Sequence, residues 1–325
     1  AEWVGVTDED GYAEVIALDR YVEDVKMSRS LTEESLPLIA IIPVEGTLMP
    51  GDSEEGMAGS DTINGYIDTA LESEDLAAVV LRVNSPGGSV FASDLIRRKL
   101  LEVADADIPI VVSMGTVAAS GGYWIAAEAD EIWALPTTLT GSIGAFSAFP
   151  TIEGIVEYIG VTVDGVGTTP LAGAASFNRG LSPEMASIVQ ALAYGAYDDF
   201  IELVASGRDM SELAVRDVAD GLVWTGAEAV ERGLVDELGG LDEAVEAAAR
   251  LAGVEDWRTA RTRVPPSFES VLLQELTRSF GLVSAPLGGW FDSLVSAFQP
   301  AIKSLSSLRD PMHVYAQCLA CAPLL

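Results

Sequence analysis

The sequence predicts an α/β protein with a largely parallel sheet, and three observations support this prediction. Short apolar runs alternate with segments of helical spacing, and several of these runs end in Gly-rich turns. Strands that alternate with helices form βαβ units, whose parallel strands are joined by right-handed crossovers. In addition, hydrophobic residues make up 49% of the 325 residues, which is enough for a sizeable buried core.

Five apolar runs are the predicted strands. They cover residues 38–44, 77–83, 108–114, 131–135 and 161–163. Each is rich in aliphatic residues and most are bounded by glycine, proline or acidic residues, which is typical of buried strands. Helical spacing predicts helices over 63–74, 89–103, about 120–129, and 183–206. The last of these has Ser182 as its expected N-cap, followed by proline at the first helical position.

The chain divides into three segments of different character. Residues 1–36 are acidic and only patchily apolar, and we interpret them as a lead-in segment. Residues 37–255 carry the strand–helix alternation and form the predicted domain. Residues 256–325 are predicted to be a helical C-terminal extension of short apolar–polar helices, interrupted by proline and glycine. The chain begins Ala1-Glu2-Trp3, so we expect the natural protein to be longer.

The acidic charge limits the classes of partner. The formal net charge is −32, which repels nucleic acid and anionic lipid head groups, so no nucleic-acid partner is expected. No cofactor or metal site is predicted either. Cys318 and Cys321 form a single Cys-x-x-Cys pair, which is weak support for zinc. A local disulfide and two unpaired thiols both remain open.

Ser120 is the candidate nucleophile, because it follows a predicted strand and is followed by two glycines. A serine hydroxyl needs a neighbouring base. The one histidine is His313, and the three lysines are Lys26, Lys99 and Lys303. A lysine base needs its pKa lowered from about 10.4 to near 7, whereas acidic surroundings favour the charged form. We therefore expect the base to come from outside this chain.

Two further turns are candidates for the same site. Gly87-Gly88 ends a predicted strand and opens a helix, so its backbone N–H groups are expected to stabilise the oxyanion of a tetrahedral intermediate. The N–H of Gly121 would be a second donor, and Ser142 would follow the next strand and line the same crevice. The alternative for these residues is ordinary turn chemistry or helix packing.

Several motifs together resemble the signal peptide peptidase A (protease IV) family. They lie at residues 81–89, 112–124, 140–144, 223–226 and 233–236, within a resemblance that spans about 37–255. The resemblance implies a Clp protease/crotonase-like fold of repeated ββα units and a Ser–Lys dyad. In the family, Ser120 matches the nucleophile, Gly87, Gly88 and Gly121 match the oxyanion hole, and Ser142 matches a serine that orients the lysine.

The family pattern also implies what this chain lacks. Short members carry the lysine after the strand equivalent to 161–166, but residues 164–170 contain none. The ending, 310–321, resembles the tail of the long form, in which two homologous halves share a polypeptide and the first half supplies the lysine. The chain therefore resembles the second half.

The expected function is a serine endopeptidase that degrades released signal peptides. The resemblance implies a companion N-terminal half, a homo-oligomeric ring, and association with the inner membrane facing the periplasm through an anchor outside this chain. A second hypothesis is a non-catalytic assembly module of a ring-shaped peptidase. A third, a crotonase-type acyl-CoA enzyme, leaves the contexts of Ser120 and Ser142 without a purpose.

Overall fold

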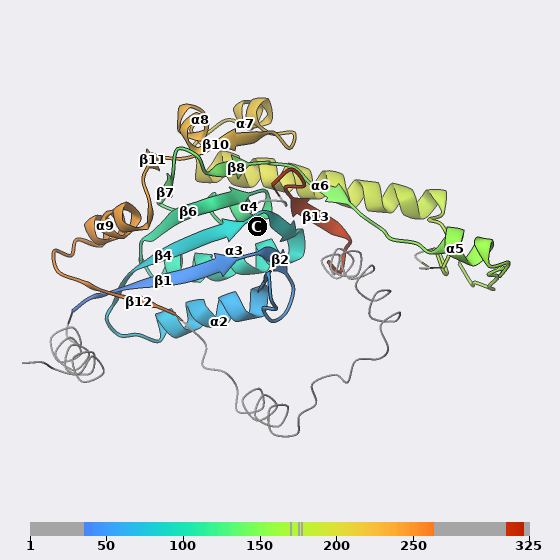
Figure 1. Ribbon diagram of the computed structural model, residues 1–325, viewed down its shortest axis with the longest axis horizontal. Coiled ribbons are helices and arrows are strands. Elements are labelled where there is room, and N and C mark those ends of the chain that lie inside the picture. Colours follow the sequence, from blue (N-terminus) through green and yellow to red (C-terminus); the bar gives the residue numbers. More distant parts are fainter. Residues whose placement is uncertain (1–35, 170, 175, 177, 263–309, 322–325) are drawn as a thin grey trace, which may run out of the picture.

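The computed structural model describes residues 36–169, 171–174, 176, 178–262 and 310–321, which form two sheets packed against helices (Figure 1). Nearly all of the lead-in segment, 1–36, lies outside these residues, as do Lys26 and Lys303.

The larger sheet contains eight strands among the described residues and is almost entirely parallel. Its order is β10 (Val223–Thr225), β8 (Leu139–Gly141), β6 (Ile110–Ala119), β4 (Leu76–Ser85), β1 (Leu38–Glu45) and β12 (Arg258–Arg261). Off this path, β7 (Glu131–Ala134) pairs with β6, and β11 (Glu237–Leu238) pairs with β7. Only the β10–β8 pair is antiparallel among these. The predicted α/β class is confirmed.

Helices cover both faces of this sheet. Successive side chains of a strand point to opposite faces, and in β1 and β4 both sets are apolar, so both faces need a covering layer. Ile42 and Leu81 join the cluster formed with α2 (Ser60–Leu71), α3 (Val90–Asp105) and α6 (Pro183–Gly207). Ile41 and Val80 instead pack against α9 (Leu241–Ala252). The remaining described helices are α4 (Gly121–Trp124), α5 (Glu153–Tyr158), α7 (Glu212–Val218) and α8 (Gly226–Glu231). As predicted, Ser182 caps α6, and its hydroxyl accepts a hydrogen bond from the N–H of Met185 at 3.2 Å.

The smaller sheet lies at the carboxyl end of the main strands. Its order is β3 (Met57–Gly59), β2 (Thr47–Met49), β5 (Gly87–Ser89), β13 (Val314–Gln317) and β9 (Phe146–Ser147). The C-terminal strand β13 is antiparallel to both of its neighbours. Residues from the two ends of the described chain thus meet beside the Gly87-Gly88 turn.

Two predicted elements differ from the structure. The fifth strand, 161–163, is absent: those residues have no regular structure, and Val161 is 51% exposed. An apolar run of three residues needs a partner strand, and β8 and β10 already continue the sheet beyond β6. The helix predicted over about 120–129 is the single turn α4, followed by non-helical turns.

The described parts of the extension are strands and not helices. β12 adds to the free edge of β1, and β13 pairs between β5 and β9. Both segments satisfy backbone groups at sheet edges that local helix formation would leave unpaired. Residues 263–309 and 322–325 lie outside the described part of the chain.

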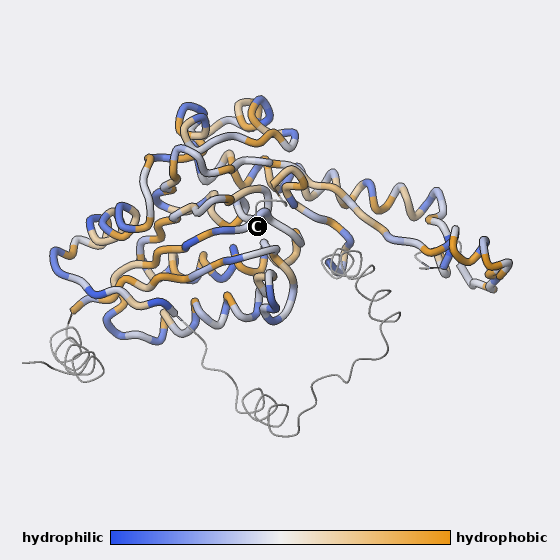
Figure 2. Tube along the Cα trace, in the orientation of Figure 1, coloured by the Kyte–Doolittle hydropathy of each residue, from blue (hydrophilic) through white to orange (hydrophobic). Residues whose placement is uncertain are grey.

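An arm of apolar character extends from the body. The described helix α5 and the first half of α6 project together (Figure 1), and hydrophobic residues are frequent along them (Figure 2). Tyr158 is 91% exposed and Ile159 is 64% exposed, while the buried residues of α6 begin only at Ala196. The arm therefore leaves a large apolar surface in solvent.

Candidate active site

Ser120 lies where β6 ends and α4 begins, in a backbone conformation that residues other than glycine rarely adopt. Its φ is 55° and its ψ is −117°. The backbone is held on both sides, because its N–H donates to the carbonyl of Gly141 and its own carbonyl accepts from Tyr123 and Trp124, each at 2.8 Å. Strain held by surrounding structure is frequent at functional sites, and a serine on a sharp strand-to-helix turn is typical of nucleophiles.

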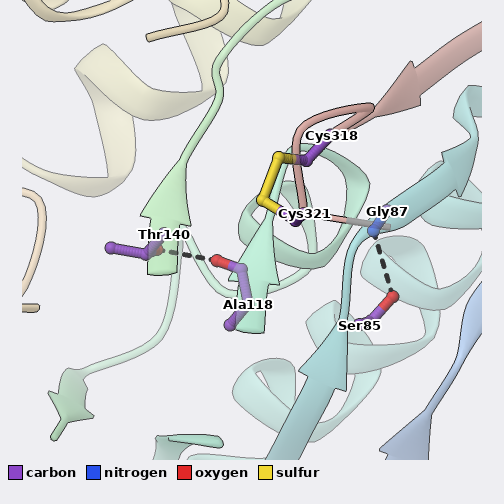
Figure 3. Close-up of a disulfide and its surroundings, with 6 residues drawn as sticks. All are labelled: Ser85, Gly87, Ala118, Thr140, Cys318 and Cys321. Atoms are coloured by element: carbon purple, nitrogen blue, oxygen red, sulfur yellow. Dashed lines mark hydrogen bonds between the residues drawn. A yellow bond between two sulfur atoms is a disulfide. The ribbon is translucent and has the colours of Figure 1, made fainter. Parts of the chain in front are cut away.

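The two predicted Gly-rich turns meet beside Ser120. A Cβ added at Gly87 would lie 2.5 Å from the N atom of Gly121, and one at Gly121 would lie 3.2 Å from the Cα of Gly87. Gly87 and Gly88 have φ values of 91° and 157°, so glycine is required where the backbones approach this closely. The N–H of Gly87 donates to Ser85 Oγ at 3.2 Å (Figure 3).

Ser142 lies just after β8 and lines the same pocket as Ser120, with a volume of about 520 Å³. Its φ is 50°, and its N–H donates to the carbonyl of Leu222 at 2.7 Å. The structure thus brings together all of the predicted site residues: both serines line the pocket, and the glycine turns adjoin Ser120.

Other residues of this pocket were not predicted from the sequence. They are Gly144, Ala145, Phe146, Gln190, Ala193, Tyr194, Tyr197, Asp220, Gly221 and Gln317. Tyr197 donates its hydroxyl to Asp220 Oδ1 at 2.7 Å, and burial together with this hydrogen bond raises the pKa of Tyr197. These residues come from the segment that follows β8, from α6, from the loop before β10 and from the C-terminal strand, so tertiary packing brings them to Ser120.

No lysine or histidine lines the pocket among the residues that the structure describes. The ammonium of Lys99 contacts Asp68 and Glu102, each at 2.6 Å, and the hydrogen bond that it donates to Asp68 is the main cause that raises its pKa. Lys99 is therefore held in the charged form, as the sequence argument expected. The His313 ring packs edge-on against Phe149, with ring centroids 4.8 Å apart.

The two cysteines are joined. Cys318 and Cys321 form a disulfide beside the ends of β4 and β6 (Figure 3). Of the two possibilities that the sequence left open, the structure has the disulfide. Within the described ranges, no group of three or more His, Cys, Asp or Glu side chains is placed to hold a metal ion.

The close approach at Gly87 leads to a stability prediction. Gly87→Ala should destabilise the protein by about 2–5 kcal/mol, because a positive φ costs about 1–2 kcal/mol and overpacking adds about 1–3 kcal/mol. The added Cβ would lie 2.1 Å from the carbonyl oxygen of Ala316. Gly51→Ala is the matched control, since its φ of 89° is similar but nothing lies within 4 Å. Urea unfolding of both variants measures the difference, and equal losses would contradict the role of this contact.

The arrangement has the parts that acyl transfer requires. A strained serine stands at the carboxyl edge of a parallel sheet, next to two glycine turns that approach each other closely and whose backbone N–H groups are candidate donors. Such donors stabilise the negative charge that develops on a carbonyl oxygen under nucleophilic attack. The fold and the pocket together define a candidate serine-hydrolase site.

Comparison with known proteins agrees with this class. Residues 102–255 match the model of peptidase family S49. The chain is 38% identical over 322 residues to Protease 4 of Haemophilus influenzae, covering 96% of this chain and 51% of that protein. It is 36% identical to a putative protease of Synechocystis sp., covering 67% and 75% respectively, and 38% identical to a putative signal peptide peptidase of Enterococcus faecium, covering 57% and 54%. The chain belongs to peptidase family S49.

The comparisons also show how much of each relative this chain covers. It spans about half the length of the Haemophilus influenzae relative. A solved ClpP1 variant of Listeria monocytogenes is similar with a TM-score of 0.39 and 15% identity, covering 63% of this chain and 94% of that one. That likeness is too remote to carry an argument. The Clp protease-like fold class follows from the family, together with the parallel sheet described above.

Proposed function

We propose that this chain is the nucleophile-bearing half of a serine endopeptidase that degrades released signal peptides, with its lysine base supplied by a companion half. The strained Ser120, in a pocket whose described lining lacks a lysine or histidine, is the observation that carries the proposal. The matched span of about half of Protease 4 and the name of the Enterococcus faecium relative support it.

In the proposed reaction, Ser120 Oγ attacks the peptide carbonyl carbon and its proton passes to the neutral lysine amine. The carbonyl oxygen becomes an oxyanion beside the N–H groups of Gly121 and the Gly87-Gly88 turn. The lysine then protonates the leaving amine, and water hydrolyses the acyl ester by the same proton transfers. Ser142, in the same pocket as Ser120, orients the lysine.

The alternative is a non-catalytic assembly module, and serine labelling separates the two. A fluorophosphonate probe should label Ser120 in the complete protein, because the base activates its hydroxyl. Labelling should require the companion half and should disappear in Ser120→Ala. Absence of labelling in the complete protein would favour the module.

The partners and location form the second part of the proposal. The exposed apolar arm supports a homo-oligomeric ring, and the disulfide supports an oxidising compartment such as the periplasm. In the described segments, no helix has both the length and the apolar character needed to cross the bilayer. We place the membrane anchor outside this chain. The charge of −32 disfavours nucleic acid.

Added salt should strengthen the proposed oligomer, because it screens the repulsion between chains of the same high charge. Sedimentation at low and high salt measures this. Tyr158→Asp should weaken the assembly, since Tyr158 is 91% exposed on the apolar arm and the charge would be buried between subunits. Leu213→Asp, at a side chain 72% exposed on α7, is the control and should not. A ring that dissociates as salt rises would contradict the proposal.

A further inference from the structure

The C-terminal strand lies in a slot beside the catalytic turns. β13 pairs antiparallel with β5 on one side and with β9 on the other, and its register sets Ala316 opposite Gly88. The carbonyl oxygen of Ala316 lies 2.1 Å from the position of a Cβ at Gly87 and 3.0 Å from that at Gly121. A main-chain carbonyl of the tail thus faces the two turns proposed to hold the oxyanion.

One residue of this strand separates two pockets. Gln317 lines the Ser120 pocket and also a second pocket of about 600 Å³. The second pocket is lined by residues of β1, β3, α2 and the connections between the strands, among them Pro43, Met57 and Tyr66. With the tail in place, the two hollows are separate. Gln317 is thus part of the lining of both, and its removal with the strand would take away a shared part of that lining.

We propose that β13 is a plug in a peptide-binding cleft, and that the Cys318–Cys321 disulfide is a thiol-operated latch that holds it there. This inference rests on the proposed peptidase function. An extended peptide would take the place of β13 by pairing with β5 and β9, since adding a strand to open sheet edges is a general mode of peptide recognition. The tail is the occupant seen in the structure, and it competes with that peptide.

The plug is attached at its first end by a buried carboxylate. Asp310 Oδ2 accepts hydrogen bonds from Ser89 Oγ at 2.5 Å and from the N–H of Phe91 at 3.2 Å. Its Oδ1 accepts from the N–H of Met312 at 2.8 Å and of Val314 at 3.1 Å. Asp310 is 2% exposed, so one side chain joins the tail to the start of α3.

The other end of the plug runs into a turn that the disulfide closes within the tail itself. The N–H of Cys318 donates to the carbonyl of Pro86 at 2.7 Å, immediately before the Gly87-Gly88 turn. Both sulfurs belong to a buried cluster with Val117 and Ala119, the residues that lead into Ser120. The covalent bond closes the turn from Cys318 to Cys321 and restricts the backbone that follows β13, so its loss frees conformations in which the strand is unpaired.

Opening the latch is a two-electron reduction. A dithiol reductant donates two electrons and two protons, the S–S bond becomes two thiols, and the reductant leaves as its own disulfide. Peptides that enter should be extended and should have a small residue where Ala316 now lies, since Ala316 is 0% exposed and its carbonyl oxygen lies close to the glycine turns. The cleft should therefore bind peptides better after reduction than before.

The test measures peptide binding and not hydrolysis, in the full chain carrying Ser120→Ala. A fluorescein-labelled synthetic peptide with the sequence of residues 310–317 is titrated by anisotropy, with and without dithiothreitol. We expect reduction to tighten the apparent affinity at least about tenfold, because the fraction of open cleft rises. The double variant Cys318→Ser/Cys321→Ser should bind the labelled peptide with the tighter affinity even when no reductant is added. Leu319→Ser is the control, because this residue lies in the same turn and is 68% exposed. Its tighter binding of the peptide should still require the reductant.

Amide hydrogen exchange separates plug release from unfolding. Exchange at 314–317 should rise on reduction while 79–83 in β4 stays protected. If the double serine variant fails to fold, Asp310→Asn replaces it, because it weakens the opposite end of the plug with little change of shape. Unchanged affinity on reduction, or faster exchange at 314–317 without peptide binding, would overturn the inference. Peptide binding needs no catalytic base, so this experiment tests the plug even if the proposed peptidase activity is not found.

Discussion

Ser120→Ala should abolish peptide hydrolysis by the complete protein and leave its assembly unchanged. Only the attacking oxygen is removed, and loss of a serine nucleophile costs roughly 10⁶-fold in turnover. The positive φ of residue 120 is held by backbone hydrogen bonds to Gly141, Tyr123 and Trp124, which alanine keeps. Hydrolysis of a fluorogenic peptide measures the activity, and sedimentation measures the assembly.

Two other serines are controls for that experiment. Ser206→Ala, at the end of α6, should keep full activity because this residue does not line the Ser120 pocket. Ser142→Ala should lose less than Ser120→Ala and should shift the pH profile, since its proposed role is to orient the base. Full activity of Ser120→Ala, or probe labelling at a different serine, would remove the assignment of the nucleophile.

The central strands were predictable because their local pattern and their tertiary environment agree. Residues 38–44 and 77–83 are continuous apolar runs, as strands buried on both faces require, and they became β1 and β4. The positions of Ser120 and Gly87-Gly88 followed from this alternation, since successive parallel strands end at one edge of the sheet. Because both turns lie at that edge, the Gly87-Gly88 turn contacts the turn that holds Ser120, and this close approach requires glycine at both turns.

Elements whose structure depends on distant partners were not predictable in this way. Val161 to Val163 has a strand-like composition but no neighbouring strand, so it stays irregular and exposed. Val314–Gln317 instead becomes a strand because β5 and β9 offer unpaired edges, more than 160 residues away in sequence. Asp220 and Gln317 reach the Ser120 pocket through such contacts, and nothing in their local sequence indicates it.

The isolated chain should hydrolyse peptide esters and amides barely above background, and the companion half should restore turnover. General-base assistance contributes roughly 10²–10⁴-fold, and we expect that factor to be missing from this chain alone. Lys99 does not replace it, because its ammonium is paired with Asp68 and Glu102 and its pKa is raised. Steady-state hydrolysis by the purified chain, alone and mixed with the companion half, measures the factor directly.

Lysine substitutions in the isolated chain decide where the base comes from. If the base belongs to the companion half, Lys26→Ala, Lys99→Ala and Lys303→Ala should all leave the low background rate unchanged. Reduction with dithiothreitol should accompany each measurement, because a plugged cleft would lower turnover even with the base present. Strong activity of the reduced chain that one of these substitutions abolishes would show that the dyad is complete within this chain. In that case the lysine would reach Ser120 from a segment outside the described residues, or from a second copy.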